Sequence, residues 1–373
     1  MPNPQGPAGA RAAASANRDG STARLIQLCA GYFLFYVITG VSVKYFQGPA
    51  DQGLPAMTGM EYLVYNTAGG TLLCLVWVFV RGWYRIESNE LVALIGLRIP
   101  RELLYIVPSG VCTAIVIPTT TLMYSLPISV MVAMVIMRGS VIVIGRLVDA
   151  VQIRQGILKK KVYLEEDLGV ICAILAVSVH LVLGSSDASF DFVHSPAAVA
   201  ILGSYLASYA IRIYIMNYYK NTRKAGVKLD NRGFMGIEQI AASVVLTLGC
   251  VVAFFAPRWF GVQSPLVTEF RSSLVAPKPI WPLAVLSGTA FGIVAFFSVF
   301  IFMFKGRTAT FAGLVNRLTS LIAGTTATLV FWAACGGKAP GLQDWVSLGL
   351  IFVAVYFLTR SEKRRAAELA AAG

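Results

Sequence analysis

Two arginines lie deep within apolar stretches of the sequence. Arg138 falls in Pro127–Val151, and Arg317 falls in Thr310–Trp332. If the first helix begins near Ile128, Arg138 lies about 15 Å along it, close to the middle of a hydrocarbon layer about 30 Å thick. A cation at that depth costs about 2.5–3.5 kcal/mol unless it faces protein, water or a ligand. Both arginines therefore need a partner or a function.

A guanidinium group suits the recognition of anions, because its five donors can pair bidentately with a phosphate or a carboxylate. Arg138 and Arg317 are therefore the first candidates for a substrate-binding site, with the adjacent Asn316. The alternative is a structural role, in which each arginine is held by helix-end carbonyls or by a polar neighbour such as Asn316. No carboxylate in the middle of a span is evident that would neutralise both cations.

Two carboxylates, Glu61 and Glu238, open apolar stretches at similar positions in the two halves of the chain. A desolvated carboxylate can titrate near neutrality, so both residues are candidates for gating or for coupling to protons. The alternative is a carboxylate near the membrane surface that is solvated or bonded to a helix N-terminus.

The composition is that of a membrane protein. Of the 373 residues, 57% are hydrophobic and only 13% are charged, and the mean hydropathy is +0.70. The six cysteines and two histidines show no metal-binding or disulfide spacing, and no phosphate-binding loop is present. We therefore predict no metal, no cofactor and no enzymatic activity. We assign the net charge of +13 to basic loops rather than to nucleic-acid binding.

Ten apolar stretches predict transmembrane helices, most of them near the length of about 20 residues that a span requires. They are Leu25–Tyr45, Tyr62–Val80, Tyr105–Tyr124, Ile128–Val151, Leu168–Gly184, Ala197–Tyr219, Ile237–Ala256, Trp281–Phe304, Thr310–Trp332 and Val346–Leu358. The segment Leu91–Ile99 is too short to span and contains Arg98, so we interpret it as an element at the membrane surface or on the cytoplasmic side.

The basic residues predict the orientation of these spans. With alternating spans, 23 of the 31 lysines and arginines lie on the side of the two termini and five lie on the other side. The remaining three are Arg138, Arg212 and Arg317, within spans. Basic loops face the cytoplasm, so we expect both termini on the cytoplasm-like or matrix-like side. Arg212 is expected to extend toward the headgroups on that side.

The two halves of the chain resemble each other. Arg138 and Arg317 are 179 positions apart, as are Gly145 and Gly324, and Glu61 and Glu238 are 177 apart. An odd number of helices per unit inserts the second copy in the opposite sense. The spacing therefore predicts an all-α integral membrane protein, with ten transmembrane helices arranged as a 5+5 inverted-topology repeat. In transporters of this kind the substrate site lies near the midplane, between the repeats.

Several segments resemble the drug/metabolite transporter superfamily, in particular its solute carrier 35 branch, subfamily F, related to nucleotide-sugar transporters. These segments are Val37–Phe46, Met123–Leu147 and Arg232–Ile240. The resemblance implies an inverted repeat, alternating access, and substrates such as nucleotide sugars, other phosphorylated metabolites or amphipathic compounds. It also implies that Met137, Arg138 and Gly139 lie on a cavity-lining fourth helix, and Arg317 on its counterpart, the ninth.

The predicted organisation has four parts. Residues 1–24 are a polar tail, 25–184 and 185–360 are the two five-helix units, and 361–373 are a C-terminal tail. The first tail contains three arginines and one aspartate. Its composition leaves open an organelle transit peptide or a plain disordered tail, so the predicted location is a cellular or an organelle membrane.

Two functions remain open. The first is a secondary transporter or exchanger of a small anionic or amphipathic metabolite, working by alternating access around Arg138 and Arg317. The second is a transporter-fold accessory subunit of a larger membrane complex, without transport activity. The expected partners are a small-molecule substrate and membrane lipid. A second copy of the chain and other membrane-protein subunits are further possible partners. Nucleic acid is not an expected partner.

Overall fold

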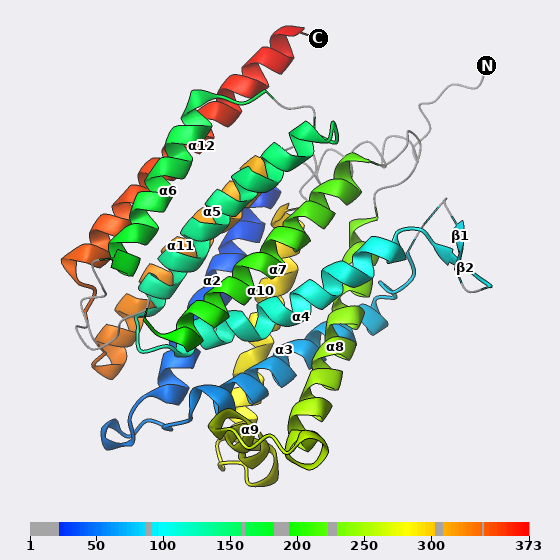
Figure 1. Cartoon of the computed structure of the whole chain (residues 1–373). Helices are drawn as coiled ribbons and strands as arrows, with labels where there is room; N and C mark the ends of the chain where they lie inside the picture. Colours follow the sequence, from blue (N-terminus) through cyan, green and yellow to red (C-terminus); the bar gives the residue numbers. More distant parts are fainter. Residues whose placement is uncertain are drawn as a thin grey trace.

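A computed structural model describes residues 22–86, 88, 91–94, 96–158, 161–182, 194–222, 230–302, 309–337 and 339–372 of the chain. Its long helices lie side by side in one bundle (Figure 1). The helices are α2 (Thr22–Gln47), α3 (Gly59–Val80), α4 (Leu103–Ser125), α5 (Val130–Arg154), α6 (Leu164–Val182), α7 (Pro196–Asn221), α8 (Asn231–Phe260), α9 (Pro265–Val275), α10 (Trp281–Phe302), α11 (Ala309–Cys335) and α12 (Leu342–Ala372).

Nine helices in the described part of the chain are long and apolar enough to cross a membrane: α2, α3, α4, α5, α7, α8, α10, α11 and α12. We expected ten. The fifth predicted span corresponds to α6, which is 19 residues long and carries three acidic residues in its first turn. Helix α6 is not among the nine. The chain is an all-α, multi-pass membrane protein.

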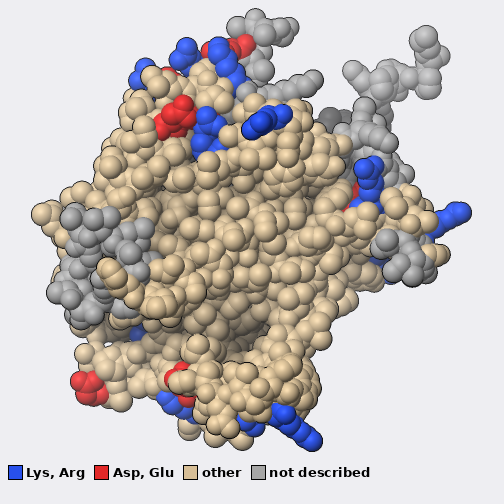
Figure 2. All heavy atoms as spheres, in the orientation of Figure 1, with Lys and Arg blue, Asp and Glu red and all other residues tan. Residues whose placement is uncertain are grey.

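The surface fits this assignment. In Figure 2 charged side chains gather at the top, at the right-hand edge and at the bottom, and a broad surface that is nearly free of them lies between these groups. Many exposed side chains are large and apolar, among them Leu72, Leu248 and Tyr356. A hydrocarbon layer would cover such a surface.

Local sequence signals explain where several helices begin. The Thr58 hydroxyl accepts a hydrogen bond from the amide of Glu61, and the Glu61 carboxylate accepts one from the amide of Thr58, which is a capping box at the start of α3. Ser129 and Ser195 accept hydrogen bonds at the starts of α5 and α7, and Asp230 does so for α8. Such caps satisfy amides that a helix leaves unpaired.

The segment Leu91–Ile99 forms most of a small antiparallel hairpin. Strand β1 (Leu91–Leu94) pairs with β2 (Leu97–Pro100), with Val92 opposite Ile99. The hairpin projects at one edge of the bundle (Figure 1). Each strand has four residues, which is too short to cross a hydrocarbon layer.

The helices pack in a regular scheme. Helix α4 packs against α7 and α8, and α10 packs against α2 and α3. Helix α11 packs against α2, α5 and α12, whereas α5 also packs against α6 and α7. Helix α6 lies along α12. Each half of the chain is therefore covered largely by helices from the other half.

Glycines permit the closest of these crossings. A Cβ on Gly292 of α10 would lie 2.7 Å from the carbonyl oxygen of Gly70 on α3, and a Cβ on Gly288 would overlap the backbone of Asn66. On the other side of the bundle, a Cβ on Gly110 of α4 would lie 2.8 Å from the carbonyl oxygen of Glu238 on α8. Small residues let membrane helices approach until their backbones touch.

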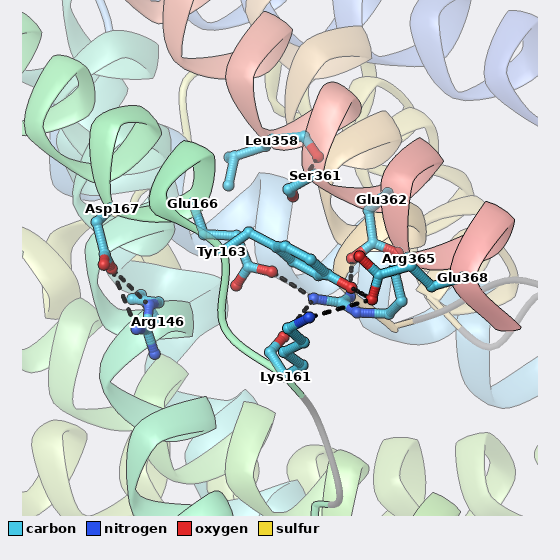
Figure 3. A network of polar contacts seen from close by, with 10 residues as sticks. All are labelled: Arg146, Lys161, Tyr163, Glu166, Asp167, Leu358, Ser361, Glu362, Arg365 and Glu368. Atoms are coloured by element: carbon cyan, nitrogen blue, oxygen red, sulfur yellow. Dashed lines mark hydrogen bonds and ion pairs between the residues drawn. The ribbon is translucent and has the colours of Figure 1, made fainter.

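Charged residues join the start of α6 to the end of α12 (Figure 3). Arg365 forms ion pairs with Glu166 and with Glu362, and Tyr163 donates a hydrogen bond of 2.8 Å to Glu368. Beside them, Arg146 of α5 pairs with Asp167 at 3.1 Å. Helix α12 is 31 residues long, or about 46 Å, so it extends beyond a hydrocarbon layer of about 30 Å.

Candidate functional site

A cavity lies in the interior of the bundle, lined by side chains of α2, α3, α4, α5, α7, α8 and α10. Its volume is about 80 Å³, enough for several water molecules. Toward the end of the bundle where α4 and α8 begin lies a cluster of buried apolar side chains, including Ile106, Met216, Met235 and Phe296. This cluster borders the cavity, because Cys74 belongs both to the cluster and to the lining of the cavity.

Arg138 is one of the cations that line this cavity. Its side chain is 5% exposed and donates hydrogen bonds to the hydroxyls of Tyr36 and, at 3.2 Å, of Tyr205. The guanidinium carbon also lies 5.6 Å from the centre of the Tyr36 ring. These partners are neutral, and Nε is buried without a hydrogen-bond partner among the described residues. The Arg138 cation therefore retains both charge and donor capacity that an anion could use.

Arg212 also lines the cavity, but its charge is neutralised. Its Nε and Nη2 atoms lie 2.8 and 2.9 Å from the two carboxylate oxygens of Glu238. That carboxylate also accepts hydrogen bonds from Ser109 and Thr113, and Glu238 is fully buried. The expectation that Arg212 extends toward the headgroups was wrong, because a buried carboxylate holds it in the interior.

Two threonine hydroxyls on α3 belong to the part of the wall that carries unused hydrogen-bonding capacity among the described residues. Thr67 and Thr71 are one helical turn apart and both line the cavity. Their Oγ1 atoms are buried without a hydrogen-bond partner among the described residues. Buried polar groups without partners are rare in folded proteins and often mark a place for water or a ligand.

Arg317 lies outside the lining of this cavity. Its side chain is 9% exposed, and a Cβ on Gly145 would lie 3.1 Å from its Nη2 atom, so the guanidinium rests against α5. Its Nε is buried without a partner among the described residues. Arg138, Tyr205 and Asp149 lie within electrostatic range of it. The two predicted arginines are therefore near each other, but only Arg138 reaches the cavity.

The other predicted binding residues lie behind the cavity wall. Asn316 is fully buried and bonds to Tyr32 and Ser298, both of which line the cavity. Met137 is fully buried in the apolar core. A Cβ on Gly139 would meet Val177 of α6 and Ile351 of α12, so Gly139 faces away from the cavity.

The two candidate gating carboxylates have different surroundings. Glu61 belongs to the capping box of α3 and forms an ion pair of 3.0 Å with Lys278. Glu238 lies seven residues inside α8 and is paired with Arg212. We had placed Glu238 at the start of its helix, but α8 begins six residues before the predicted Ile237, which sets the carboxylate about 10 Å into the bundle.

The chemistry available in the cavity is that of binding. The Arg138 guanidinium, the hydroxyls of Thr67 and Thr71, and several tyrosine rings can together hold an anion that also carries hydrogen-bonding groups. Among the described residues, no cluster of three or more His, Cys, Asp or Glu side chains could hold a metal ion.

Comparison with known proteins does not assign the chain to a family. Neither a scan against protein-family models nor a search of curated proteins gives a match to this chain.

Proposed function

We propose that the chain is a secondary transporter or exchanger of a small anionic or amphipathic metabolite, with the substrate bound in the cavity beside Arg138. The observation that supports this proposal most directly is the environment of the Arg138 side chain. It is a buried cation in a cavity, and its hydrogen-bond partners are neutral tyrosines. A buried cation of this kind costs several kcal/mol unless an opposite charge compensates it. An anionic substrate would supply that charge.

Alternating access would arise from two inverted repeats, in which α2, α3, α4, α5 and α6 correspond to α7, α8, α10, α11 and α12. The packing supports this correspondence. The contact of α3 with α10 matches that of α8 with α4, and the contact of α2 with α11 matches that of α7 with α5. The contacts of α2 with α10 and of α7 with α4 match as well. Gly110 and Gly288, which are 178 positions apart, both lie at such crossings.

This arrangement counts α6 as a tenth span. Its support is the contact of α6 along α12, together with the position of its three acidic residues in the first turn, where they would lie at the membrane surface. With ten spans the start of α2 and the end of α12 fall at the same end of the bundle, as they do in Figure 1.

Uptake into proteoliposomes tests the proposal. The purified chain is reconstituted and supplied with radiolabelled inorganic phosphate, phosphoenolpyruvate, a dicarboxylate, a nucleoside monophosphate or, as the neutral control, glucose. We expect uptake or exchange of at least one anion. Arg138→Ala should reduce it by roughly tenfold or more, because hydrogen bonds to charged groups contribute about 1.5–3 kcal/mol. Arg138→Lys should retain part of it, since the charge remains but the bidentate geometry is lost.

The matched control is Arg98→Ala, because Arg98 is exposed on the hairpin and does not line the cavity. It should transport like the unmodified chain. Full transport by a folded Arg138→Ala variant would contradict the role of Arg138. No uptake of any anion by the folded, unmodified chain would contradict transport.

The second candidate is an accessory subunit without transport activity. The small volume of the cavity, about 80 Å³, and the extension of α12 beyond the membrane favour it. In that case the chain extracted in mild detergent would migrate with other membrane subunits, and the Arg138→Ala variant would assemble normally. A chain that purifies alone and transports an anion excludes this second role.

A further inference from the structure

A second cavity lies at the end of the bundle that holds α9. Its volume is about 480 Å³, several times that of the inner cavity. We call it the vestibule. It is lined by the ends of α2, α4 and α11 and by the start of α3, including Lys44, Gln47, Ser125, Leu126 and Phe331. The helices α2, α3 and α4 line both cavities, so the two spaces follow one another along the same helices.

A layer of hydrogen bonds separates the two cavities. The hydroxyls of Tyr36 and Tyr124 are 2.8 Å apart, and Asn66 donates a hydrogen bond of 3.2 Å to Thr121. At the floor of the vestibule, Gln47 donates to Ser125 at 2.6 Å, and Lys44 donates to the carbonyl of Leu126 at 3.1 Å. We call these residues the polar layer. Each of its bonds joins α4, or the residue that follows it, to α2 or α3.

The polar layer crosses the boundary between two groups of helices. Helix α4 packs closely against α8 at Gly110, and the ion pair of Arg212 with Glu238 joins α7 to α8. Helices α2 and α3 pack against α10, and the crossing of α3 with α10 is a backbone contact at Gly70 and Gly292. Three of the four hydrogen bonds of the polar layer join neutral side chains, and water can replace such bonds at little net cost. Separation at the polar layer leaves both groups intact.

We propose that the vestibule is the site through which a small anion reaches the inner cavity, and that the polar layer is the gate, opened when α4 moves away from α2 and α3. This proposal rests on the proposed transport function. Lys44 defines the class of ligand, because its ammonium has three donors and one of them holds the Leu126 carbonyl. An anion in the vestibule competes with that carbonyl for Lys44 and loosens the end of α4.

A cross-link across the gate tests the proposal. Gly59 begins α3, and a Cβ there would lie 3.1 Å from the Cβ of Ser125, near the separation of about 3.5–4.5 Å found in disulfides. The variant Gly59→Cys/Ser125→Cys is made in a chain whose native cysteines, except Cys74, are replaced by alanine or serine. Cys74 lines the inner cavity and serves as the reporter.

The measurement is the rate at which a small, membrane-impermeant methanethiosulfonate modifies Cys74, followed by peptide mass spectrometry. The reagent is added to vesicles whose α9 side faces outward. A separate Ser272→Cys variant, on the exposed surface of α9, establishes that orientation. The same protein after reduction, and the single variants Gly59→Cys and Ser125→Cys, are the matched controls.

We expect the reduced protein and both single variants to be modified at Cys74, and the oxidised protein to be protected. Tyr124→Phe, which removes the bond to Tyr36, should be modified about fivefold faster, the shift expected for one neutral hydrogen bond. Equal rates before and after oxidation, or no modification of Cys74 in any form, would overturn the gate.

The readout separates the gate from the transport function, because Cys74 is modified whether or not an anion is carried. Protection on oxidation without any anion uptake leaves the gate standing and rejects transport. Uptake that continues in the oxidised protein, with Cys74 still modified, rejects the gate and leaves transport standing.

Discussion

Two buried guanidiniums near the same cavity differ in what they contact. Arg212 has a carboxylate partner that accepts both of its bonds, whereas Arg138 bonds to tyrosine hydroxyls. The first is neutralised by this carboxylate, whereas no ion pair of the second is found among the described residues. At the scale of single residues, we therefore assign Arg212 to stability and Arg138 to binding.

Removing one member of the buried pair should destabilise the protein strongly. Glu238→Gln leaves the Arg212 charge without its partner, which costs about 3–5 kcal/mol for a fully buried pair. We expect a clearly lower midpoint of thermal unfolding in detergent, and partial recovery in the double variant Glu238→Gln/Arg212→Gln.

Glu61→Gln is the matched control, because the pair of Glu61 with Lys278 is partly exposed, with 38% of the Lys278 side chain accessible. An exposed pair contributes only about 0–1 kcal/mol, so this variant should unfold near the temperature of the unmodified protein. Similar losses in Glu238→Gln and Glu61→Gln would contradict the structural role of the buried pair.

For single residues, the sequence predicted which arginines lie within the membrane spans. It did not predict all of the side chains that these arginines contact. Arg138 stands out because it lies in the middle of an apolar run, and the structure places it in the cavity. The pairing of Arg212 with Glu238 was missed because we set the start of α8 too late, which put the carboxylate near the surface. The two opposite charges in consecutive spans were the available signal.

At the scale of elements, the extension of α12 depends on its contacts with the start of α6. The hydrogen bond from Tyr163 lowers the pKa of the Glu368 carboxyl below its ordinary value of 4.5, and Lys161 and Arg364 lower this pKa further. The ionised carboxylate thus favours the docked extension (Figure 3). Because the pKa is lowered in the folded protein, this contribution is complete above the ordinary value and is lost as the pH falls through the lowered value.

A spin label at Ala367→Cys tests this dependence, because residue 367 is exposed near the end of α12. We expect an immobile spectrum from pH 7 to pH 5 and increasing mobility only below 4.5, the ordinary value for Glu368. Tyr163→Phe removes the donor but keeps the ring, so mobility should begin at a higher pH. A label at Ser272→Cys on α9 is the control, and an identical pH profile in Tyr163→Phe would contradict the proposed contact.

The helices themselves were largely predictable, because apolar runs of about 20 residues leave few alternatives in a membrane. The residues at which the helices begin and end were less predictable. The last span was predicted as Val346–Leu358, but α12 runs from Leu342 to Ala372, since charged residues outside the hydrocarbon layer continue the helix. The strands of the hairpin were not predicted, because Leu91–Ile99 is too short to distinguish a strand from a helix by periodicity.

At the scale of the whole molecule, the two halves are interleaved. Helix α2 packs against α10 and α11, and α4 packs against α7 and α8, so most contacts of the first half lie in the second. A half expressed alone would expose glycine-rich and polar surfaces that lipid does not match. The halves therefore depend on one another for folding.

Cutting the chain tests this dependence. Fragments 1–184 and 185–373, which separate the predicted five-helix units, should each be degraded or aggregate when produced alone. Produced together, they should associate into one complex that unfolds near the temperature of the intact chain. A first fragment that is stable, monomeric and folded by itself would contradict the interleaved packing.

The internal similarity was visible in the sequence, but the interleaving was not. Constant offsets between arginines and glycines predict a repeat. They do not say which helix touches which, because α3 and α10 lie more than 200 positions apart in the chain and their contact depends on small residues that face each other only in the folded bundle.

The pairing of Arg212 with Glu238 has a consequence for how the chain is made. The two residues lie on consecutive helices, α7 and α8, so both leave the ribosome within a short interval. Inserting either charge alone costs about 2.5–3.5 kcal/mol, but a helical hairpin that enters the bilayer with its ion pair already formed avoids much of this penalty. A translocon that accepts α7 and α8 together, rather than one at a time, would suit this protein best.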